Sequence, residues 1–118
     1  MKSKYSHIFS PFTVQRMTTK NRIVMTPMGT NFGEHSGEMS FLHINYYEQR
    51  AKGGVGLLTV ENASVYSPQG SNGTTQLRID RDEFIPRLFN LCERVHKHGA
   101  CISIQLNHAG ASAMSSRT

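Results

Sequence analysis

The sequence predicts an α/β protein in which three parallel strands alternate with two helices in the order β-α-β-α-β. Three short apolar runs, at 23–26, 55–65 and 100–106, are typical of strands, and turn-forming residues follow each of them. The two segments between them carry apolar residues at the spacing of a helix face. Because crossovers between parallel strands are right-handed, we expect the loops that follow the three strands to lie at one edge of the sheet.

The first strand is predicted at Ile23–Thr26. It ends where Pro27, which cannot donate a ladder hydrogen bond, and Gly29 follow. Gly29 has no Cβ, so a flat ligand could lie against its backbone. Before this strand, an apolar alternation at 9–14 and a polar stretch at 15–22 predict a small hairpin that covers one end of a sheet or barrel.

The first helix is predicted between a polar cap and a glycine stop. Ser40 can cap the helix start, and the glycine pair at 53–54 ends it. Its apolar face consists of Ile44, Tyr47 and Ala51. The glycine-containing loop at 30–39 precedes the helix, and loops of this length in compact domains are often functional.

The second half of the chain repeats this pattern. The second strand centres on 57–60, and an evident loop at 67–75 follows it. A second helix opens with acidic residues at 80–83, tolerates Pro86 only in its first turn, and ends at Gly99.

Alternate residues of the third strand form two sets that point in opposite directions. The set expected under the helices consists of Ile102, Ile104 and Leu106. The set expected to face the interior of a barrel consists of Cys101, Ser103 and Gln105. Such a β-α-β-α-β unit fits half of a doubly wound sheet or three strands of an eight-stranded barrel. A complete barrel needs about 250 residues, so this chain cannot close one.

Composition limits the function classes. The 118 residues suffice for one domain with a modest core. Thirteen Lys and Arg residues against eight Asp and Glu give a net charge of +5, but the basic residues are scattered. A solvated basic surface is therefore favoured over a nucleic-acid-binding patch, which would rest on charge alone.

The sequence also predicts the compartment. No apolar run approaches the roughly 18 residues of a membrane span, and the N-terminus lacks the hydrophobic segment of a signal peptide. We expect a cytoplasmic protein with no membrane partner. Cys92 and Cys101 match neither a CxxC site nor a disulfide scaffold, so we expect two small core residues in a reducing compartment.

Six histidines are spread along the chain, and no pair has a metal-ligand spacing with a third ligand nearby, so no metal site is predicted. We expect five of them at surface or loop positions: His7, His35, His43, His96 and His98. The sixth, His108, follows the third strand, and we expect it to orient a loop rather than to act in catalysis.

Four stretches, in this order, carry a resemblance to a known family. They are 9–12 (Phe-Ser-Pro-Phe), 20–29 (Lys-Asn-Arg-Ile-Val-Met-Thr-Pro-Met-Gly), 47–58 (Tyr-Glu-Gln-Arg-Ala-Lys-Gly-Gly-Val-Gly-Leu-Leu) and 105–110 (Gln-Leu-Asn-His-Ala-Gly). Together they resemble the N-terminal third of the old yellow enzyme family, FMN-dependent ene-reductases on a (β/α)8 barrel, and are most similar to its 2-enoate and 2,4-dienoyl-CoA reductase branch. The resemblance implies that residues 1–118 are one partial domain, the N-terminal third of an FMN-binding TIM barrel.

The resemblance also implies site residues. It places the backbone of the first strand's exit against the flavin ring, that is Thr26, Pro27, Met28 and Gly29. It places Asn62 beside the flavin and the side-chain amide of Gln105 on the pyrimidine edge, where an amide offers both a donor and an acceptor. From spacing alone, Gln105 could equally be a polar strand-end residue bonded to a loop, and Pro27 and Gly29 could form a simple turn. No catalytic residue is predicted in this chain.

The implied activity belongs to a longer protein. NAD(P)H would reduce FMN, and the flavin would pass hydride to the β-carbon of an α,β-unsaturated carbonyl compound, an enone or enoate. The family's proton donor, substrate-binding pair, iron–sulfur cysteines and FAD site fall in regions that this chain does not contain, and Ala111 stands where many members carry arginine. We therefore expect the chain to need the remainder of the barrel and to be inactive alone. The alternative is a non-catalytic remnant or interaction module without flavin, whose third strand has an open edge.

Overall fold

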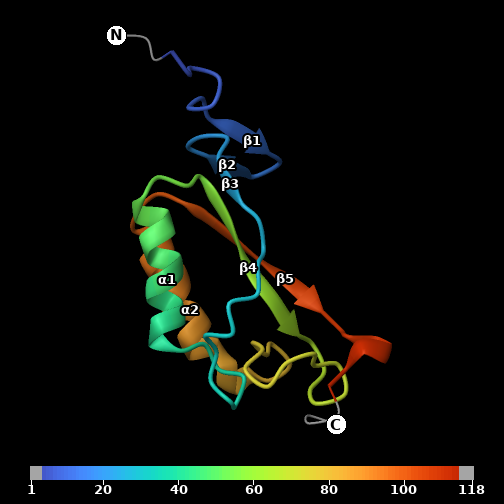
Figure 1. Ribbon diagram of the computed structural model, residues 1–118. Coiled ribbons are helices and arrows are strands. Elements are labelled where there is room, and N and C mark those ends of the chain that lie inside the picture. The colour runs from blue at the N-terminus through green and yellow to red at the C-terminus, as the bar shows by residue number, and fades with distance from the viewer. Residues whose placement is uncertain (1–3, 115–118) are drawn as a thin grey trace.

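The computed structural model describes residues 4–114. In chain order the elements are β1 (Phe12–Val14), β2 (Met17–Thr19), β3 (Val24–Met25), α1 (Phe41–Lys52), β4 (Leu57–Ser64), the 3-10 turn η1 (Asp82–Phe84), α2 (Ile85–His96), β5 (Cys101–Asn107) and the 3-10 turn η2 (Gly110–Ser112). The predicted order of a hairpin followed by β-α-β-α-β is confirmed (Figure 1).

The main sheet has the strand order β3-β4-β5, and both pairs are parallel. The strands therefore send their following loops to one edge, as predicted. The first strand is shorter than the predicted Ile23–Thr26, because only Val24 and Met25 pair with β4. The carbonyl of Ile23 still accepts the amide of Gly56 at 3.1 Å, so the chain approaches β4 just before β3 begins.

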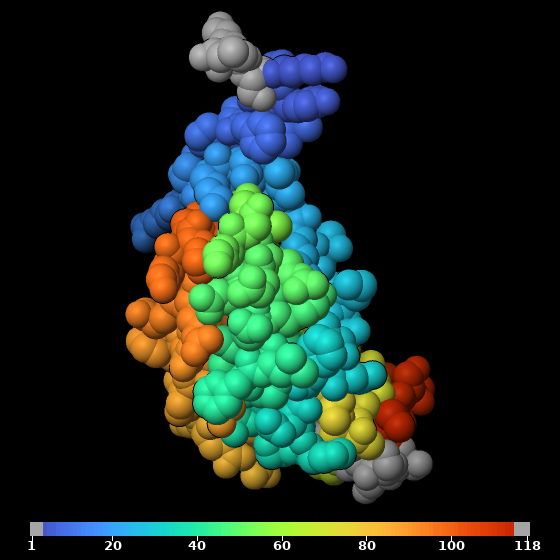
Figure 2. Space-filling view, turned by 60° about the vertical axis from the view of Figure 1, so that its left-hand side comes forward, coloured from blue at the N-terminus to red at the C-terminus, as the bar shows by residue number. Residues whose placement is uncertain are grey.

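Both helices lie side by side and cover one face of this sheet, as Figures 1 and 2 show. Ser40 caps α1 as predicted, since its hydroxyl accepts the amide hydrogen of His43 at 3.0 Å. The predicted apolar face of α1 is fully buried and consists of Ile44, Tyr47 and Ala51. The second helix starts through η1, and Pro86 occupies its first turn. No helix in residues 4–114 is long and apolar enough to cross a membrane.

The alternation along β5 is confirmed only in part. Ile102 and Ile104 pack against the core under the helices, whereas Leu106 is 62% exposed. Leu106 was wrongly predicted to be covered because β5 extends past the core to Asn107. On the other face, the hydroxyl of Ser103 bonds the hydroxyl of Thr59 at 2.8 Å. Within the described residues, the outer edge of β5 pairs with no strand.

The hairpin of β1 and β2 is antiparallel and lies at the end of the sheet where the parallel strands begin (Figure 1). The ammonium group of Lys20 donates to the carbonyl of His98 at 2.8 Å, and the thiol of Cys101 lies 3.4 Å from the carbonyl of Thr18. The predicted cover over one end of the sheet is therefore present. Cys92 and Cys101 are free and half-buried. The prediction that both are core residues is therefore wrong, because neither is fully buried.

Gly56, at the entry to β4, is expected to tolerate no side chain. A Cβ there would lie 2.8 Å from the carbonyl oxygen of Asn21, a residue that is 8% exposed and bonds the Gly54 carbonyl at 2.7 Å. We expect Gly56→Ala to lower the free energy of unfolding by about 1–3 kcal/mol in urea titration, because the crowding displaces this turn. Gly73→Ala is the control, since its Cβ would meet Gln76 at an ordinary 3.8 Å. Equal stability of the two variants would contradict the prediction.

Candidate functional site

The site lies where the parallel strands end, and β4 is irregular at this edge. The pairing of β4 with β5 shifts between Val60 and Ala63, so that Glu61 and Asn62 together lie opposite Gln105. Such a bulge bends a strand and changes where its side chains point. It brings two of the predicted site residues, Asn62 and Gln105, next to each other on neighbouring strands.

These two residues share the face of the sheet that the helices leave free. Ile104 packs under the helices, and Gln105, the next residue on β5, points the opposite way and is exposed. Ala63 is fully buried and pairs with Leu106, so Asn62 precedes it on the same open face as Gln105. In a closed barrel this face is the interior, as the alternation predicts for Gln105.

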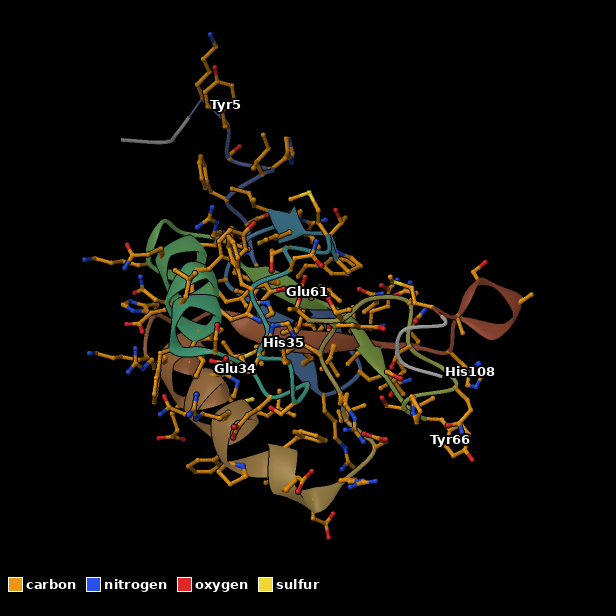
Figure 3. The ribbon with its side chains drawn as sticks, turned by 60° about the horizontal axis from the view of Figure 1, so that its bottom comes forward. Tyr5, Glu34, His35, Glu61, Tyr66 and His108 are labelled. Atoms are coloured by element: carbon orange, nitrogen blue, oxygen red, sulfur yellow. The ribbon has the colours of Figure 1, made fainter. Side chains whose placement is uncertain are left out.

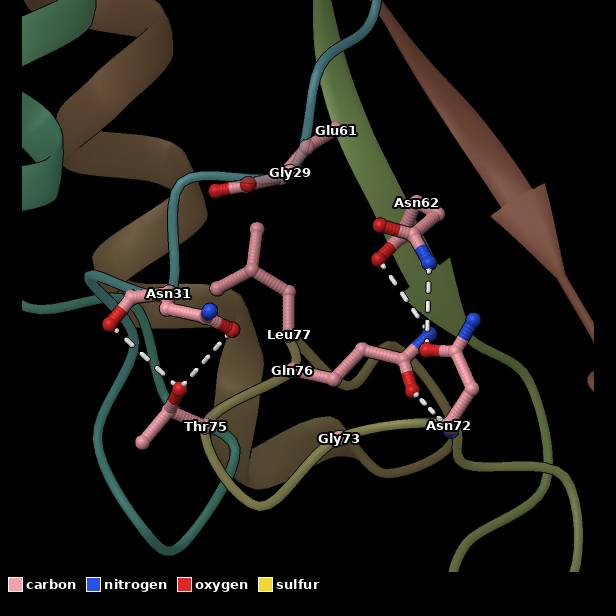
Figure 4. A pocket seen from close by; sticks show the side chains of 9 residues that line it. All are labelled: Gly29, Asn31, Glu61, Asn62, Asn72, Gly73, Thr75, Gln76 and Leu77. Carbon is pink, nitrogen blue, oxygen red and sulfur yellow. Dashed lines mark hydrogen bonds between the residues drawn. The ribbon is translucent and has the colours of Figure 1, made fainter. Parts of the chain in front are cut away.

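A polar pocket of about 350 Å³ opens beside Asn62 (Figure 4). It is lined by Gly29, Asn31, Glu61, Asn62, Asn72, Gly73, Thr75, Gln76 and Leu77. One wall comes from the segment after β3 and the other from the loop after β4. A Cβ on Gly29 would lie 3.8 Å from Asn62 Oδ1, so these two predicted site residues are neighbours across the pocket.

Side-chain amides fix the second wall. The Asn62 amide donates to Asn72 Oδ1 at 3.3 Å, and Gln76 Oε1 accepts the Asn72 amide hydrogen at 2.7 Å. Gln76 is 7% exposed, and its own amide donates to Asn107 Oδ1 at 3.1 Å. The hydroxyl of Thr75 donates to the carbonyl of Asn31, which joins the two walls. The pocket is therefore a preformed surface of donors and acceptors.

Behind the pocket lies a buried cluster that was not predicted from the sequence. His43 is 0% exposed and its Nε2 contacts Glu61 Oε1, so the prediction of a surface or loop position for His43 is wrong. Thr30 donates to both carboxylate oxygens of Glu61, through its hydroxyl at 2.8 Å and through its amide. Burial opposes ionisation of Glu61, but the hydrogen bonds from His43 and Thr30 outweigh it and hold the pKa below its ordinary value.

Tyr47 of α1 completes the back of this cluster. Its hydroxyl accepts the backbone amide hydrogen of Glu61 at 3.0 Å, and its ring stacks on His43 with centroids 5.3 Å apart. Burial raises the pKa of Tyr47 well above its ordinary value, so the hydroxyl stays protonated. The helix and the strand are thus joined at Glu61 through both backbone and side chain.

The loop after β4 is held by a second charged group. Arg78 donates to Asp80 through two nitrogens, at 3.0 and 2.9 Å, and to the carbonyl of Ser36 at 3.3 Å. Asp80 also accepts the amide hydrogen of Ser67 at 3.0 Å. Burial opposes ionisation of Asp80, but the hydrogen bonds from Arg78 and Ser67 hold its pKa below the ordinary value. Arg78 therefore ties together the loops that supply the two pocket walls.

His108 lies away from this pocket, next to Tyr66 (Figure 3). Its ring stacks on Tyr66 with centroids 6.3 Å apart, and its Nδ1 accepts the Gly110 amide hydrogen at 3.1 Å. These contacts orient the loops after β4 and β5, in keeping with the predicted role of His108. Within residues 4–114, no cluster of three His, Cys, Asp or Glu side chains could hold a metal ion.

The predicted site residues are only partly brought together. Gly29 and Asn62 line the pocket, and Gln105 lies opposite the bulge beside them. The three residues that directly follow β3 do not line the pocket: Thr26, Pro27 and Met28. Met28 is 60% exposed, so its side chain is available at the open edge. Flavin contact by all six residues stays a prediction.

Parallel β-α units, a hairpin over the amino ends of the strands and a pocket at their carboxyl ends together define part of a (β/α)8 barrel, a fold whose sites lie at that end. The sequence profile of the NADH:flavin oxidoreductase / NADH oxidase family matches residues 7–118. The chain therefore belongs to this family, which confirms the resemblance seen in the sequence.

Curated relatives of this chain are consistent with this family membership. An NADH oxidase from Thermoanaerobacter brockii is 44% identical over 106 residues, which are 90% of this chain and 16% of that protein. The NADPH dehydrogenase of Bacillus subtilis (strain 168) is 44% identical over 107 residues, 90% of this chain and 31% of that protein. The chain thus spans less than a third of the length of these relatives.

Solved structures give the same fold. The old yellow enzyme from Trypanosoma cruzi matches with a TM-score of 0.84 and 29% identity, over 95% of this chain and 29% of that one. The old yellow enzyme from Pichia sp. AKU4542 matches with a TM-score of 0.84 and 30% identity, over 91% of this chain and 28% of that one. The predicted fold class, a hairpin and a β-α-β-α-β portion of a TIM barrel, is confirmed.

Proposed function

We propose that this chain forms one wall of an FMN site in an NAD(P)H-dependent flavin oxidoreductase. The observation that carries the proposal is the placement of Gly29, Asn62 and Gln105 at the carboxyl edge of the sheet, around its helix-free face. Family membership over residues 7–118 supports it, as do the NADH oxidase and NADPH dehydrogenase among the relatives.

The residues present fit a flavin. Its isoalloxazine ring is flat, and its pyrimidine edge carries both N–H and C=O groups. Gly29 offers a wall without a side chain, and the exposed amide of Gln105 can both donate and accept. We propose that Thr26, Pro27, Met28 and Gly29 contact the ring through their backbone, and that Asn62 and Gln105 contact its polar edge.

The proposed reaction is reduction of an activated C=C bond. When bound, FMN would take hydride from NAD(P)H and deliver it to the β-carbon of an enone or enoate. The protein's part here is to hold the ring by hydrogen bonds that tune its electronics. We assign no proton donor among the described residues. Among residues 4–114, Cys92 and Cys101 are free and no group of three candidate ligands gathers, so no iron–sulfur cluster is proposed for them. FAD is not part of the proposal either.

The remainder of the barrel is the proposed partner. An apolar groove of about 240 Å³ runs between α2 and β5. It is lined by Val60, Ile79, Leu88, Leu91, Cys92, Ile102, Ser103 and Ile104. In a closed barrel a further strand pairs with the open edge of β5 and a further helix covers such a groove. We propose that the 118-residue chain alone reduces no enone with NAD(P)H; turnover by the purified chain would contradict this.

FMN titration tests the proposal. We expect binding to shift the flavin absorbance and quench its fluorescence, and Gln105→Ala to weaken binding about tenfold through lost hydrogen bonds. Gly29→Ala is expected to weaken binding similarly while changing stability by less than about 0.5 kcal/mol, because its Cβ meets protein atoms only at 3.8 Å or beyond.

The control is Gly53→Ala, at the end of α1 and outside the pocket, which should leave FMN binding unchanged. A colourless, self-associating protein that shows no FMN signal would favour the alternative, an interaction module built on the exposed edge of β5.

A further inference from the structure

The buried cluster behind the pocket forms hydrogen bonds to the segment that makes the first pocket wall. Glu61 lies near the middle of the molecule in Figure 3, and its two carboxylate oxygens together accept three hydrogen bonds. Two of the donors belong to Thr30, one from its main chain and one from its side chain. Charge-assisted pairs of this kind fix geometry as well as adding energy, so the carboxylate is an anchor for the segment that contains Thr30.

The anchor extends along the chain through Thr30. The Thr30 hydroxyl accepts the amide hydrogen of Phe32 at 3.2 Å, and the carbonyl of Phe32 accepts a hydrogen bond from the Ser40 hydroxyl. Ser40 in turn caps α1 through the amide of His43. The segment 30–32 is therefore held at once by β4, through Glu61, and by the start of α1.

This segment is the first wall of the pocket. Gly29 and Asn31 flank Thr30, and both line the pocket. A Cβ on Gly29 would lie 3.8 Å from Asn62 Oδ1 and 3.9 Å from Glu61 Oε2, so a small displacement of Thr30 would change the width between the walls. The position of Thr30 thus sets the distance between Gly29 and Asn62.

A merely structural link between α1 and β4 would not need a carboxylate. Tyr47 already joins the two elements through the Glu61 backbone, and well-packed apolar residues are often as stabilising as a buried charge. The carboxylate adds two fixed hydrogen-bond acceptors for the segment that follows β3. Among the described residues, this segment pairs with no strand. The partner that compensates the buried carboxylate is His43, whose Nε2 contacts Glu61 Oε1.

We propose that Glu61 is a positioning residue: it holds Gly29 and Asn31 against Asn62 through Thr30, and the affinity of the pocket for its ligand depends on this link. For FMN as that ligand, the inference rests on the proposed function. Glu61 acts through Thr30 and touches no reacting atom.

Amide hydrogen exchange and FMN titration of the purified protein test this inference with Thr30→Val, Thr30→Ser and Glu61→Gln. Valine matches threonine in shape but removes the hydroxyl, so we expect the Phe32 amide to exchange at least about tenfold faster and FMN to bind about tenfold more weakly. Glu61→Gln should likewise make the Thr30 amide hydrogen exchange faster, because it removes a carboxylate acceptor. Serine keeps the hydroxyl and should restore both readouts to within about twofold.

Thr59→Val is the matched control, because the Thr59 hydroxyl bonds Ser103 on the same sheet but lies outside the pocket. Unchanged exchange at Phe32 in Thr30→Val would overturn the anchor, and unchanged FMN affinity despite faster exchange would overturn its role in binding. If the unchanged protein gives no FMN signal, the proposed function fails, and the exchange data alone then decide the anchor.

Discussion

Replacing His43 with leucine is expected to lower the free energy of unfolding by about 3–5 kcal/mol, because a buried charge is left without its partner. His43 is 0% exposed and Glu61 is 4% exposed, so water compensates little of the lost contact. Equilibrium unfolding in urea measures the effect. His96→Leu is the control, since His96 is exposed on α2, and its change should stay within about 0.5 kcal/mol.

The His43→Leu variant should also show a distinct pH dependence. Hydrogen bonds lower the pKa of Glu61 in the folded protein, so its contribution to stability is present above the unfolded-state pKa and is lost as pH falls through the folded one. Without His43, burial favours the protonated carboxyl. The deficit against the unchanged protein should therefore shrink as pH falls below about 4.3, the unperturbed value for glutamate. A deficit that stays constant to pH 3 would contradict this account.

Replacing Arg78 with methionine is expected to lower the free energy of unfolding by about 2–4 kcal/mol, since it leaves a largely buried aspartate unpaired. The side chains of Arg78 and Asp80 are 13% and 9% exposed. Methionine keeps the aliphatic stem that packs on Gly37 while removing the guanidinium. Urea unfolding measures the loss, and faster proteolytic cleavage in the loop at 67–75 should accompany it.

Arg81→Met is the matched control, because Arg81 is exposed and caps η1 without a side-chain hydrogen bond. The lowered pKa of Asp80 also predicts how the stability of Arg78→Met changes with pH. Its stabilisation is present above the unfolded-state pKa and disappears as pH falls through the folded one, so Arg78→Met and the unchanged protein should converge in acid. Equal losses in Arg78→Met and Arg81→Met would contradict the assigned role of Arg78.

Local signals in the sequence account for most of the fold. Ser40, the glycine pair at 53–54 and Pro86 each act through their own backbone or cap geometry, so their effects can be predicted without tertiary contacts. The placement of Gln105 on the open face follows from the two-residue period of a strand. The same period fails at Leu106, because burial there depends on how far the helices extend.

The buried pair could not be predicted in this way. His43 and Glu61 lie on different elements, and nothing within a helical turn of His43 indicates that a carboxylate from β4 will meet it. Histidine next to Ile44 on the buried side of α1 was the one available signal. The bulge was equally hidden, since its extra residue shows only when β4 is paired with β5.

The bulge has a practical consequence for engineering this chain. Before it, the even-numbered residues Leu58 and Val60 face the helices; after it, the odd-numbered Ala63 does. Deleting either residue at 61 or 62 would restore an unbroken strand and leave Ala63 and Ser64 paired as they are now, but it would remove the side chain of Glu61 or Asn62 from the pocket. Library designs and gap placement in sequence comparisons should therefore treat positions 61 and 62 as a single unit.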